Sequence, residues 1–378
     1  MTELSQLLSQ LVAINSINPD LVPKGAGEYE IAQFVATWCR QHGLEVHIEE
    51  AAPHRPNVIA IARGTGGGKS LMLNAHMDVV GVAGMQRPFD PTIEDGKLYG
   101  RGAFDMKGSL AASMLVTARA KELGLAGDVI LTAVVDEEYA SIGTSTVMKS
   151  GWKADACIVT EPTAMELCVA HKGFAWIDVE TFGVAAHGSQ PQTGVDAITK
   201  MGHVLVELDK LNQRLLGSKR HKLLGTGSLH ASLISGGQEL SSYPAHTKLQ
   251  VERRTIPGET QEQVNEQIQQ ILRFLTLDDP SFKAKAEITL MRDSFEIAET
   301  APIVKTLKQS VQQVRGAAPT IAGASFWMDS ALTSAAGIPT VIFGPSGDGA
   351  HAEIEWVDLA TVEQCVEIYL AAAKAFCV

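Results

Sequence analysis

The feature of this chain that most constrains its fold is a series of short apolar runs, several of them followed closely by a histidine or a carboxylate. The runs cover residues 71–73, 129–135, 156–159 and 339–343, and their length and composition are typical of buried strands. In open α/β sheets, ligands bind at the carboxyl ends of the strands. The sequence therefore predicts one sheet edge that carries the side chains of His76, Asp78, Glu137, Glu138, Glu161 and His351.

The order of the predicted elements indicates two domains, one inserted into the other. Up to about Lys172, strands alternate with helices such as those over 27–42 and 109–123, which predicts an α/β fold with a mostly parallel sheet flanked by helices. A strand, helix, strand, strand, helix, strand order follows, which is the ferredoxin-like split βαβ arrangement. We therefore predict a discontinuous domain, residues 1–173 and 291–378, and an inserted α+β domain, residues 174–290.

Composition excludes several classes of protein. The formal net charge of −12 over 378 residues argues against binding to nucleic acid or to anionic membranes. No apolar run approaches the roughly 18 residues of a membrane span, and residues 1–8 lack the basic and apolar segments of a signal peptide. The five cysteines are scattered without a CxxC pair. Free thiols in a reducing compartment fit this pattern, which predicts a cytoplasmic protein.

A glycine-rich segment at residues 63–70 is similar to a phosphate-binding loop. The phosphate-loop pattern, however, requires glycine where Arg63 stands, and a strand rather than a helix follows the segment. We predict a glycine-rich hairpin turn here.

A histidine and an aspartate separated by one residue follow the first apolar run. If His76 binds a metal ion through one ring nitrogen, the other ring N–H requires an acceptor, and Asp78 is close enough in sequence to provide it. A surface histidine beside a surface aspartate is the alternative. Asp105 lies in a stretch rich in glycine, residues 100–108. Glycine lets a backbone turn tightly and approach a ligand closely, although an ordinary turn aspartate would fit the same pattern.

Carboxylates follow the next two runs, and a histidine follows the last. Asp136, Glu137 and Glu138 end the run at 129–135, and in extended backbone adjacent side chains point to opposite sides. One glutamate can then ligate a metal ion while its neighbour stands free as a general base; a solvated acidic loop is the alternative. Glu161 precedes a proline that disfavours helical backbone, and His351 lies on a loop. Together these imidazoles and carboxylates form a ligand set for two divalent metal ions.

The motifs occur in a recognisable order along the chain. They are His76-Met77-Asp78, residues 99–102 with Asp105 to Gly108, Asp136-Glu137-Glu138, Glu161-Pro162, residues 186–189, residues 337–345, and His351. They resemble the zinc-dependent amidohydrolase and metallopeptidase family of acetylornithine deacetylase, succinyl-diaminopimelate desuccinylase, aminoacylase and glutamate carboxypeptidase. The similarity covers nearly the whole chain.

The resemblance implies a role for each motif residue of the discontinuous domain. Asp105 would bridge two zinc ions. Cobalt is another metal that would fit. His76 and Glu161 would complete one metal site, and Glu138 and His351 the other. Asp78 would orient His76, and Glu137 would be the general base. The resemblance also implies a cis peptide bond between Asp105 and Met106.

Further roles are implied for the inserted domain, which would be a lid and dimerisation domain. His187 would reach the active site of the other subunit of a homodimer and stabilise the oxyanion there, whereas from the residues alone it is a loop histidine before a helix. Arg254 would bind the substrate carboxylate, a task that suits the bidentate guanidinium. Adjacent Arg253 would point to the opposite face of its strand.

The resemblance also predicts the reaction. Glu161 is the glutamate variant that accompanies deacylases and carboxypeptidases, so we expect hydrolysis of the amide bond of an N-acyl amino acid. Ser241 stands where the family often has a substrate-binding asparagine, which leaves the substrate open. The alternatives are a dipeptidase or a glutamate-type carboxypeptidase with the same di-zinc site, and a catalytically silent binding protein. The filled set of ligand positions argues against the silent protein.

Overall fold

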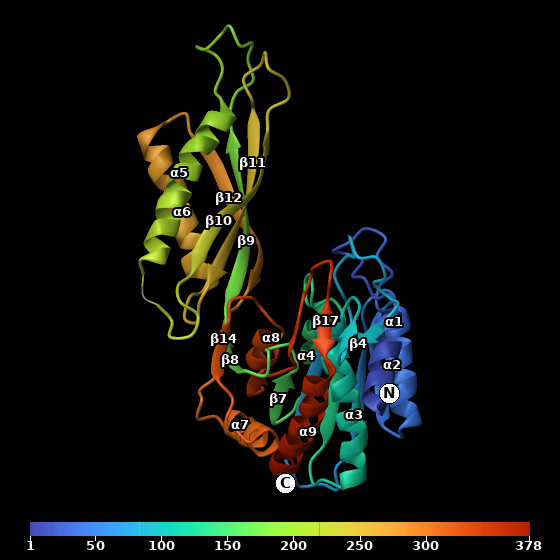
Figure 1. The fold of residues 1–378 in the computed structure, drawn as a ribbon. Coiled ribbons are helices and arrows are strands. Elements are labelled where there is room, and N and C mark those ends of the chain that lie inside the picture. Colours follow the sequence, from blue (N-terminus) through green and yellow to red (C-terminus); the bar gives the residue numbers. More distant parts are fainter. Residues whose placement is uncertain (83, 219) are drawn as a thin grey trace. The chain divides into compact units, whose positions relative to one another are not determined.

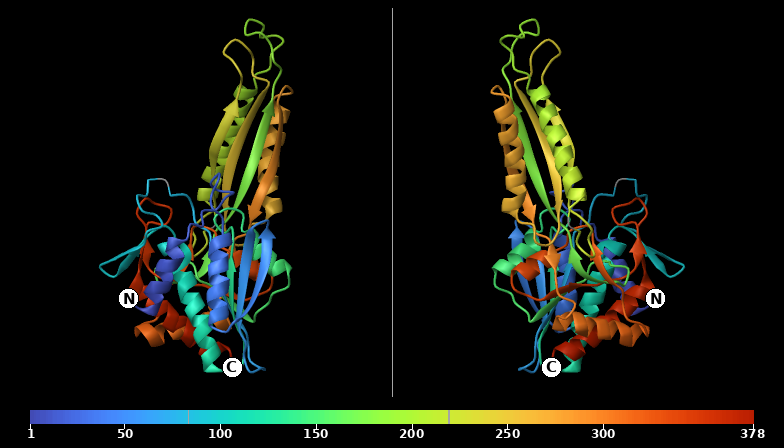
Figure 2. Two further views of the ribbon diagram at one scale, coloured as in Figure 1. Left: turned by 90° about the vertical axis from the view of Figure 1, so that its right-hand side faces the viewer. Right: turned by 90° about the vertical axis from the view of Figure 1, so that its left-hand side faces the viewer.

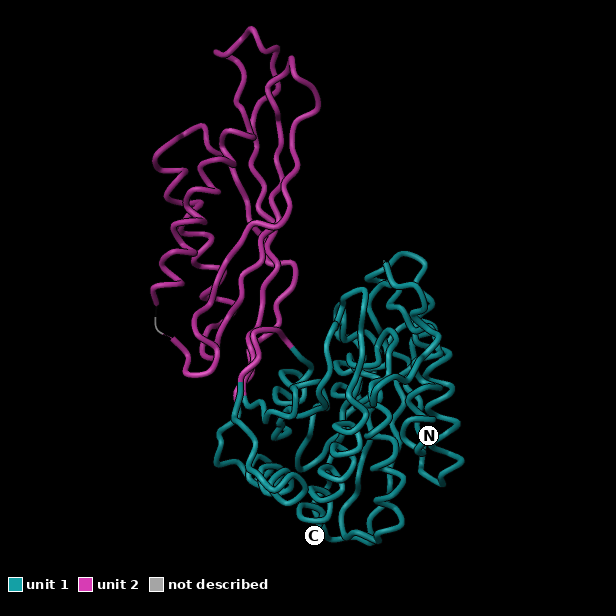
Figure 3. Tube along the Cα trace, viewed as in Figure 1, with its two compact units in different colours: residues 1–169, 297–322, 328–378 teal, residues 170–296, 323–327 magenta. Residues whose placement is uncertain are grey.

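The computed structural model describes residues 1–82, 84–218 and 220–378, which divide into two compact units (Figure 3). The first unit comprises Met1–Val169, Ile297–Ala322 and Met328–Val378. The second unit comprises Ala170–Glu296 and Gly323–Trp327.

A mixed β-sheet forms the centre of the first unit. Its strands lie in the order β1 (Glu45–Ala52), β2 (Arg55–Ala62), β6 (Val129–Val134), β3 (Leu71–His76), β7 (Ala156–Val159), β15 (Thr340–Ile342) and β8 (Leu167–His171), and the short β13 (Phe295–Glu296) and β14 (Ile321–Ala324) pair with β8. The β6–β3, β3–β7 and β7–β15 pairs are parallel, whereas β1–β2, β2–β6 and β15–β8 are antiparallel. The predicted α/β class is confirmed, with antiparallel strands on both sides of the parallel centre.

Complete burial explains why these strands appear as continuous apolar runs in the sequence. Every residue of β2, β3, β6 and β7 is buried, as expected for strands with both faces covered. Helices flank the sheet, and they are labelled in Figure 1. They are α1 (Glu3–Ala13), α2 (Tyr29–Gln41), α3 (Gly108–Leu123), α4 (Ile142–Lys149), α7 (Pro302–Arg315), α8 (Ser330–Ala335) and α9 (Leu359–Phe376).

A small antiparallel sheet completes the first unit. Its order is β16 (Gly347–Asp348), β17 (Trp356–Asp358), β5 (Lys97–Tyr99) and β4 (Thr92–Glu94). It joins the chain around Asp105 to the chain around His351, because β5 precedes the first and β16 the second. Among the helices of the described residues, none is long and apolar enough to cross a membrane.

The prediction of a hairpin turn at residues 63–70 was wrong. The segment joins β2 to β3, but β6 lies between these two strands in the sheet. Its backbone is held instead by the connection before β6, through hydrogen bonds from Thr65 N to Leu125 O (2.8 Å) and from Gly66 N to Ala126 O (2.9 Å). A turn rich in glycine predicts a tight change of chain direction. It does not determine whether the two strands that it connects pair with each other in the sheet.

The second unit is a four-stranded antiparallel sheet with two helices on one face (Figure 2). The strand order is β10 (Ser228–Gly236), β11 (His246–Thr255), β9 (Gly173–Phe182) and β12 (Lys283–Arg292), and the helices are α5 (Ala197–Leu216) and α6 (Gln261–Asp278). Burial alternates along β9, because only one face is covered. This is the predicted split βαβ topology.

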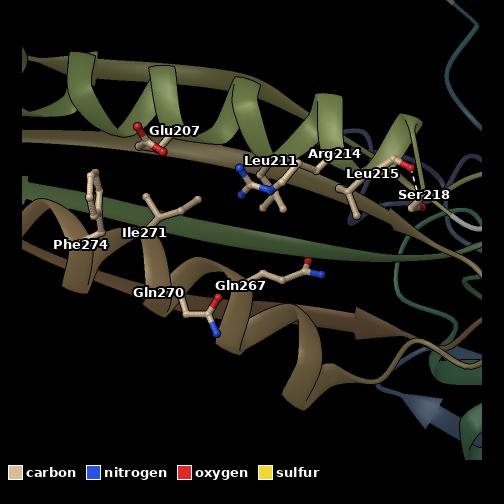
Figure 4. A pocket seen from close by; sticks show the side chains of 9 residues that line it. All are labelled: Glu207, Leu211, Arg214, Leu215, Ser218, Gln267, Gln270, Ile271 and Phe274. Carbon is tan, nitrogen blue, oxygen red and sulfur yellow. Dashed lines mark hydrogen bonds between the residues drawn. The ribbon is translucent and has the colours of Figure 1, made fainter.

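The core of the second unit lies between this sheet and its helices. Ile177 and Val179 of β9 pack with Met201 and Leu208 of α5 and with Ile268 of α6. Between the two helices, Leu211, Leu215, Ile271 and Phe274 line a groove together with polar side chains (Figure 4).

Candidate metal centre

Three of the predicted ligand segments leave the central sheet at the same edge. His76 is the last residue of β3 and pairs with Val134 of β6, while Asn74 pairs with Val159 of β7. Because β3 is parallel to both neighbours, the chain beyond β6, which carries Glu137 and Glu138, and the chain beyond β7, which carries Glu161, emerge beside His76. The topology of the sheet therefore assembles the site.

Asp105 is presented by an irregular segment, Ala103–Lys107. Gly102 precedes it with φ 79°, a conformation that favours glycine. Within the segment, Asp105 (φ −115°, ψ 95°) and Met106 (φ −132°, ψ 32°) depart from helical geometry. The peptide bond between Asp105 and Met106 is cis, as the sequence resemblance predicted.

His76, Asp105 and Glu161 form one group of potential metal ligands. The Nε2 atom of His76 lies 3.1 Å from Asp105 Oδ1 and 3.6 Å from Glu161 Oε1. One ligand atom from each of the three residues lies within 4.8 Å of the other two. His76 is buried, so its imidazole has little freedom to leave this geometry.

Asp105, Glu138 and His351 form a second group on the other oxygen of the same aspartate. The Nε2 atom of His351 lies 2.9 Å from Glu138 Oε2 and 3.5 Å from Asp105 Oδ2. The three ligand atoms again lie within 4.8 Å of one another. The His351 side chain is 56% exposed, so this second group is more open to solvent than the first.

Asp78 contacts His76 and also the backbone of the two glutamates. The Nδ1 atom of His76 lies 3.0 Å from the main-chain oxygen of Asp78 and 3.6 Å from its carboxylate. The carboxylate itself accepts hydrogen bonds from the backbone N–H groups of Glu137 (3.1 Å) and Glu138 (3.2 Å). In this structure the backbone oxygen is the nearer acceptor for His76, and the carboxylate fixes the chain that carries Glu137 and Glu138.

The backbone at Glu137 and Glu138 is a turn, and the prediction of extended backbone there was wrong. Asp136 has φ 67°, and its carbonyl oxygen accepts a hydrogen bond from Ser141 N at 2.6 Å. The strand therefore ends at Val134, and the separation of the two glutamates arises from the turn rather than from strand alternation. A left-handed aspartate is uncommon and leaves no periodic signal in the sequence.

The electrostatics of the site follow from crowding of carboxylates in a buried place. Burial, reinforced by the negative charge of Glu161, raises the pKa of Glu137 well above its usual value. Burial and the charge of Asp105 raise the pKa of Glu138 to about 7. Hydrogen bonds to Asp105 and Glu138 raise the pKa of His351 to about 10. Each carboxylate thus makes ionisation of its neighbours harder, and a bound cation would relieve that repulsion.

The donor set fits two divalent metal ions. Each group offers one imidazole nitrogen and carboxylate oxygens, which are ligands of zinc and of related divalent metals. Asp105 belongs to both groups through different oxygens, so one carboxylate can bridge two ions. Both groups lie within the first unit.

Glu355 is a site residue that the sequence analysis did not identify. Its buried carboxylate accepts hydrogen bonds from the backbone N–H groups of Gly102, Phe104 and Asp105, each at 3.0 Å. It also pairs with Arg101 at 2.7 Å, and Arg101 donates to Ala352 O at 2.8 Å, next to His351. One carboxylate thereby holds the backbone of Asp105 and, through Arg101, the loop of His351.

We expect Glu355→Gln to reduce the free energy of unfolding by about 3–5 kcal/mol, because it leaves the buried Arg101 without its counter-ion. The change keeps the size of the side chain but points an amide N–H at groups that are themselves donors. Urea unfolding of the variant would measure the loss. Glu353→Gln, two residues earlier and exposed, is the control. Equal stability of the two variants would contradict the role of Glu355.

The structure places His187 and Arg254 in the second unit. His187 is exposed, and its Nδ1 lies 2.7 Å from the hydroxyl of Ser189 and accepts the Ser189 backbone N–H at 3.2 Å. Arg254 lies on β11, where its Nε donates to Glu252 at 2.6 Å and its guanidinium lies 5.4 Å from the centre of the Phe174 ring. Arg253 is buried and pairs with Glu259, in keeping with alternation along the strand.

Comparison with known proteins decides the family. The model of peptidase family M20/M25/M40 matches residues 72–375. This chain belongs to that family. It is 29% identical to the acetylornithine deacetylase of Myxococcus xanthus, over 98% of this chain and 96% of that protein. It is 27% identical to N-formyl-4-amino-5-aminomethyl-2-methylpyrimidine deformylase of Halalkalibacterium halodurans, over 99% and 94%.

Solved structures of other proteins share the fold. A tripeptidase from Staphylococcus aureus has a TM-score of 0.81 at 21% identity, covering 99% of this chain and 98% of its own. A dinuclear metal binding peptidase of the M20 family from Bacillus subtilis has a TM-score of 0.74 at 14% identity, covering 99% and 97%. The M20 membership makes this protein a hydrolase of a metal-dependent family with a candidate metal centre at His76, Asp105 and Glu161.

Proposed function

We propose that this M20 hydrolase cleaves the amide bond of an N-acyl amino acid and releases a carboxylate and a free amino acid. The observation that carries the proposal is the pair of three-residue ligand groups that share Asp105. Two amide-cleaving enzymes among the relatives, a deacetylase and a deformylase, support a deacylase rather than a peptidase.

Some of these residues would bind the metal ions, and others would take part in the reaction or position the residue that does. His76, Asp105 and Glu161 would hold one zinc ion, and Asp105, Glu138 and His351 the other, with cobalt as an alternative metal. When bound, two such ions lower the pKa of a water molecule and polarise the amide carbonyl. Asp78 fixes the backbone of Glu137. Glu137 takes the proton of the attacking water and delivers it to the leaving amine.

Two residues of the second unit would contact the substrate. Arg254 would bind the free carboxylate of the substrate, and His187 would donate a hydrogen bond to the oxyanion, a contribution of about 3–4 kcal/mol for one well-placed donor. We further propose that His187 serves the partner subunit of a homodimer. The five cysteines are all buried and none forms a disulfide bond, which supports a cytoplasmic location.

A substrate panel tests the proposal. We expect the zinc- or cobalt-loaded protein to hydrolyse some N-acetyl or N-formyl amino acids with kcat/KM at least about 100-fold above any dipeptide, because a site built to pair with one polar group rejects compounds that lack or mismatch it. Release of the free amine would be followed at fixed metal concentration, with metal-free protein as the control. Faster cleavage of dipeptides than of every N-acyl amino acid would overturn the deacylase and favour a peptidase.

A further inference from the structure

Asn18 contacts the two aspartates, Asp78 and Asp136, that hold the turn carrying Glu137 and Glu138. Its side chain is completely buried, and its amide nitrogen donates to Asp78 Oδ2 at 2.8 Å and to Asp136 Oδ1 at 2.9 Å. Its amide oxygen accepts from the backbone N–H groups of Asp20 (3.0 Å) and Leu21 (3.3 Å). Because the oxygen faces donors and the nitrogen faces acceptors, the orientation of the amide is unambiguous.

The two carboxylates that Asn18 joins are the supports of the turn. Asp78 accepts from the backbone N–H groups of Glu137 and Glu138. Asp136 accepts from those of Ala140 and Ile142 through its Oδ2. Asn18 is therefore the connection between the two acceptors that hold the turn at both ends.

The backbone of Asn18 is hydrogen-bonded to the chain that follows β3, independently of its side chain. Its N–H donates to Val79 O at 2.9 Å, and Val79 N donates to Ser16 O at 3.0 Å. The amide therefore projects from a fixed backbone position between Asp78 and Asp136.

Charge explains why an amide suits this position. Asp78 and Asp136 are both fully buried, and two carboxylates side by side repel each other unless donors separate them. Asp136 also has Arg55 at 3.0 Å, and Arg55 is shared with the buried Glu28. Asn18 places one N–H on each carboxylate and adds no charge of its own.

We propose that Asn18 is a positioning residue that sets the location of Glu137 and Glu138 by bridging Asp78 and Asp136. The inference rests on the proposed roles of Glu137 as the base and Glu138 as a metal ligand. The segment between α1 and α2, which contains none of the proposed metal ligands, would thereby affect catalysis.

Hydrogen exchange tests the positioning without any substrate. In zinc-loaded Asn18→Ala, the amides of Glu137 and Glu138 should exchange roughly 5- to 10-fold faster, because their acceptor Asp78 is no longer held. The control is Asn74→Ala, which removes an equally buried amide that donates to the hydroxyls of Thr132 and Thr144, each at 3.1 Å. In the control, the exchange of Glu137 and Glu138 should match the wild type.

Kinetics then separate positioning from general destabilisation. Asn18→Ala should lower kcat roughly 10- to 100-fold with KM nearly unchanged, because a displacement of about 1 Å can cost that much in rate without affecting substrate binding. Asn74→Ala should keep kcat within about twofold at a temperature where both variants are folded. The hydroxyl of Asn18→Ser can donate to only one carboxylate, so the kcat of this variant should lie between those of Asn18→Ala and the wild type. Asn18→Ser replaces Asn18→Ala in both measurements if Asn18→Ala does not fold.

Unchanged exchange at Glu137 and Glu138 in the Asn18 variants, or an equal increase in Asn74→Ala, would overturn the inference. A loss of kcat of the same size in Asn18→Ala and Asn74→Ala would overturn it as well. If the wild-type protein hydrolyses no N-acyl amino acid, the proposed function fails, but the exchange measurement still decides the role of Asn18.

Discussion

Replacing Glu137 with glutamine should leave two metal ions bound and reduce kcat/KM by about 10²–10⁴-fold, the usual contribution of a general base. Glu137 belongs to neither of the ligand groups found among the described residues, so its loss should not empty a metal site. Its backbone is held by Asp78, and glutamine has nearly the same shape. The change therefore removes the proton acceptor and little else.

The measurement combines kinetics on a hydrolysed N-acyl amino acid with elemental analysis of the purified variant. Glu138→Gln is the contrasting variant, because Glu138 lies 2.9 Å from His351 in the second ligand group. It should lose metal as well as activity. Near-normal turnover by Glu137→Gln with two ions bound would refute the assignment of the base.

Much of the fold could be predicted because burial on both faces leaves a simple signal. The strands β3, β6 and β7 are wholly buried, so each appears in the sequence as an apolar run with a clear end. Parallel pairing of these strands then brings the residues beyond their ends together. In the second unit, one covered face gives the alternating pattern of β9, and this pattern located the inserted elements.

Other parts could not be predicted because they depend on contacts between residues distant in sequence. Glu355 acts on backbone N–H groups some 250 positions earlier, and backbone donors have no sequence signature. The left-handed turn at Asp136 is likewise specified by partners such as Asn18 and Arg55. The position of β6 between β2 and β3 depends on pairing across the sheet, which no local turn pattern encodes.

His187 should act across a homodimer, and a mixture of two inactive variants should therefore regain activity. Its Nδ1 accepts the Ser189 backbone N–H, which leaves Nε2 as the ring nitrogen that would donate to an oxyanion. We expect Glu137→Ala and His187→Ala to be nearly inactive as separate proteins. After subunits are exchanged, a heterodimer has one site with both an intact Glu137 and a partner that supplies His187.

The size of the recovery distinguishes this arrangement from the alternatives. Random exchange makes about half of the dimers heterodimers, each with one complete site of two, so activity should reach roughly a quarter of wild type. The same mixing with His42→Ala, an exposed histidine of the first unit, in place of His187→Ala controls for the handling of the subunits. If His187 serves its own chain, each site of a heterodimer combines one intact residue of the pair with one substituted residue. The pair of residues in any one chain is then never complete, because each chain carries one of the two substitutions. No recovery after confirmed exchange would therefore show that His187 acts within its own subunit or takes no part in catalysis.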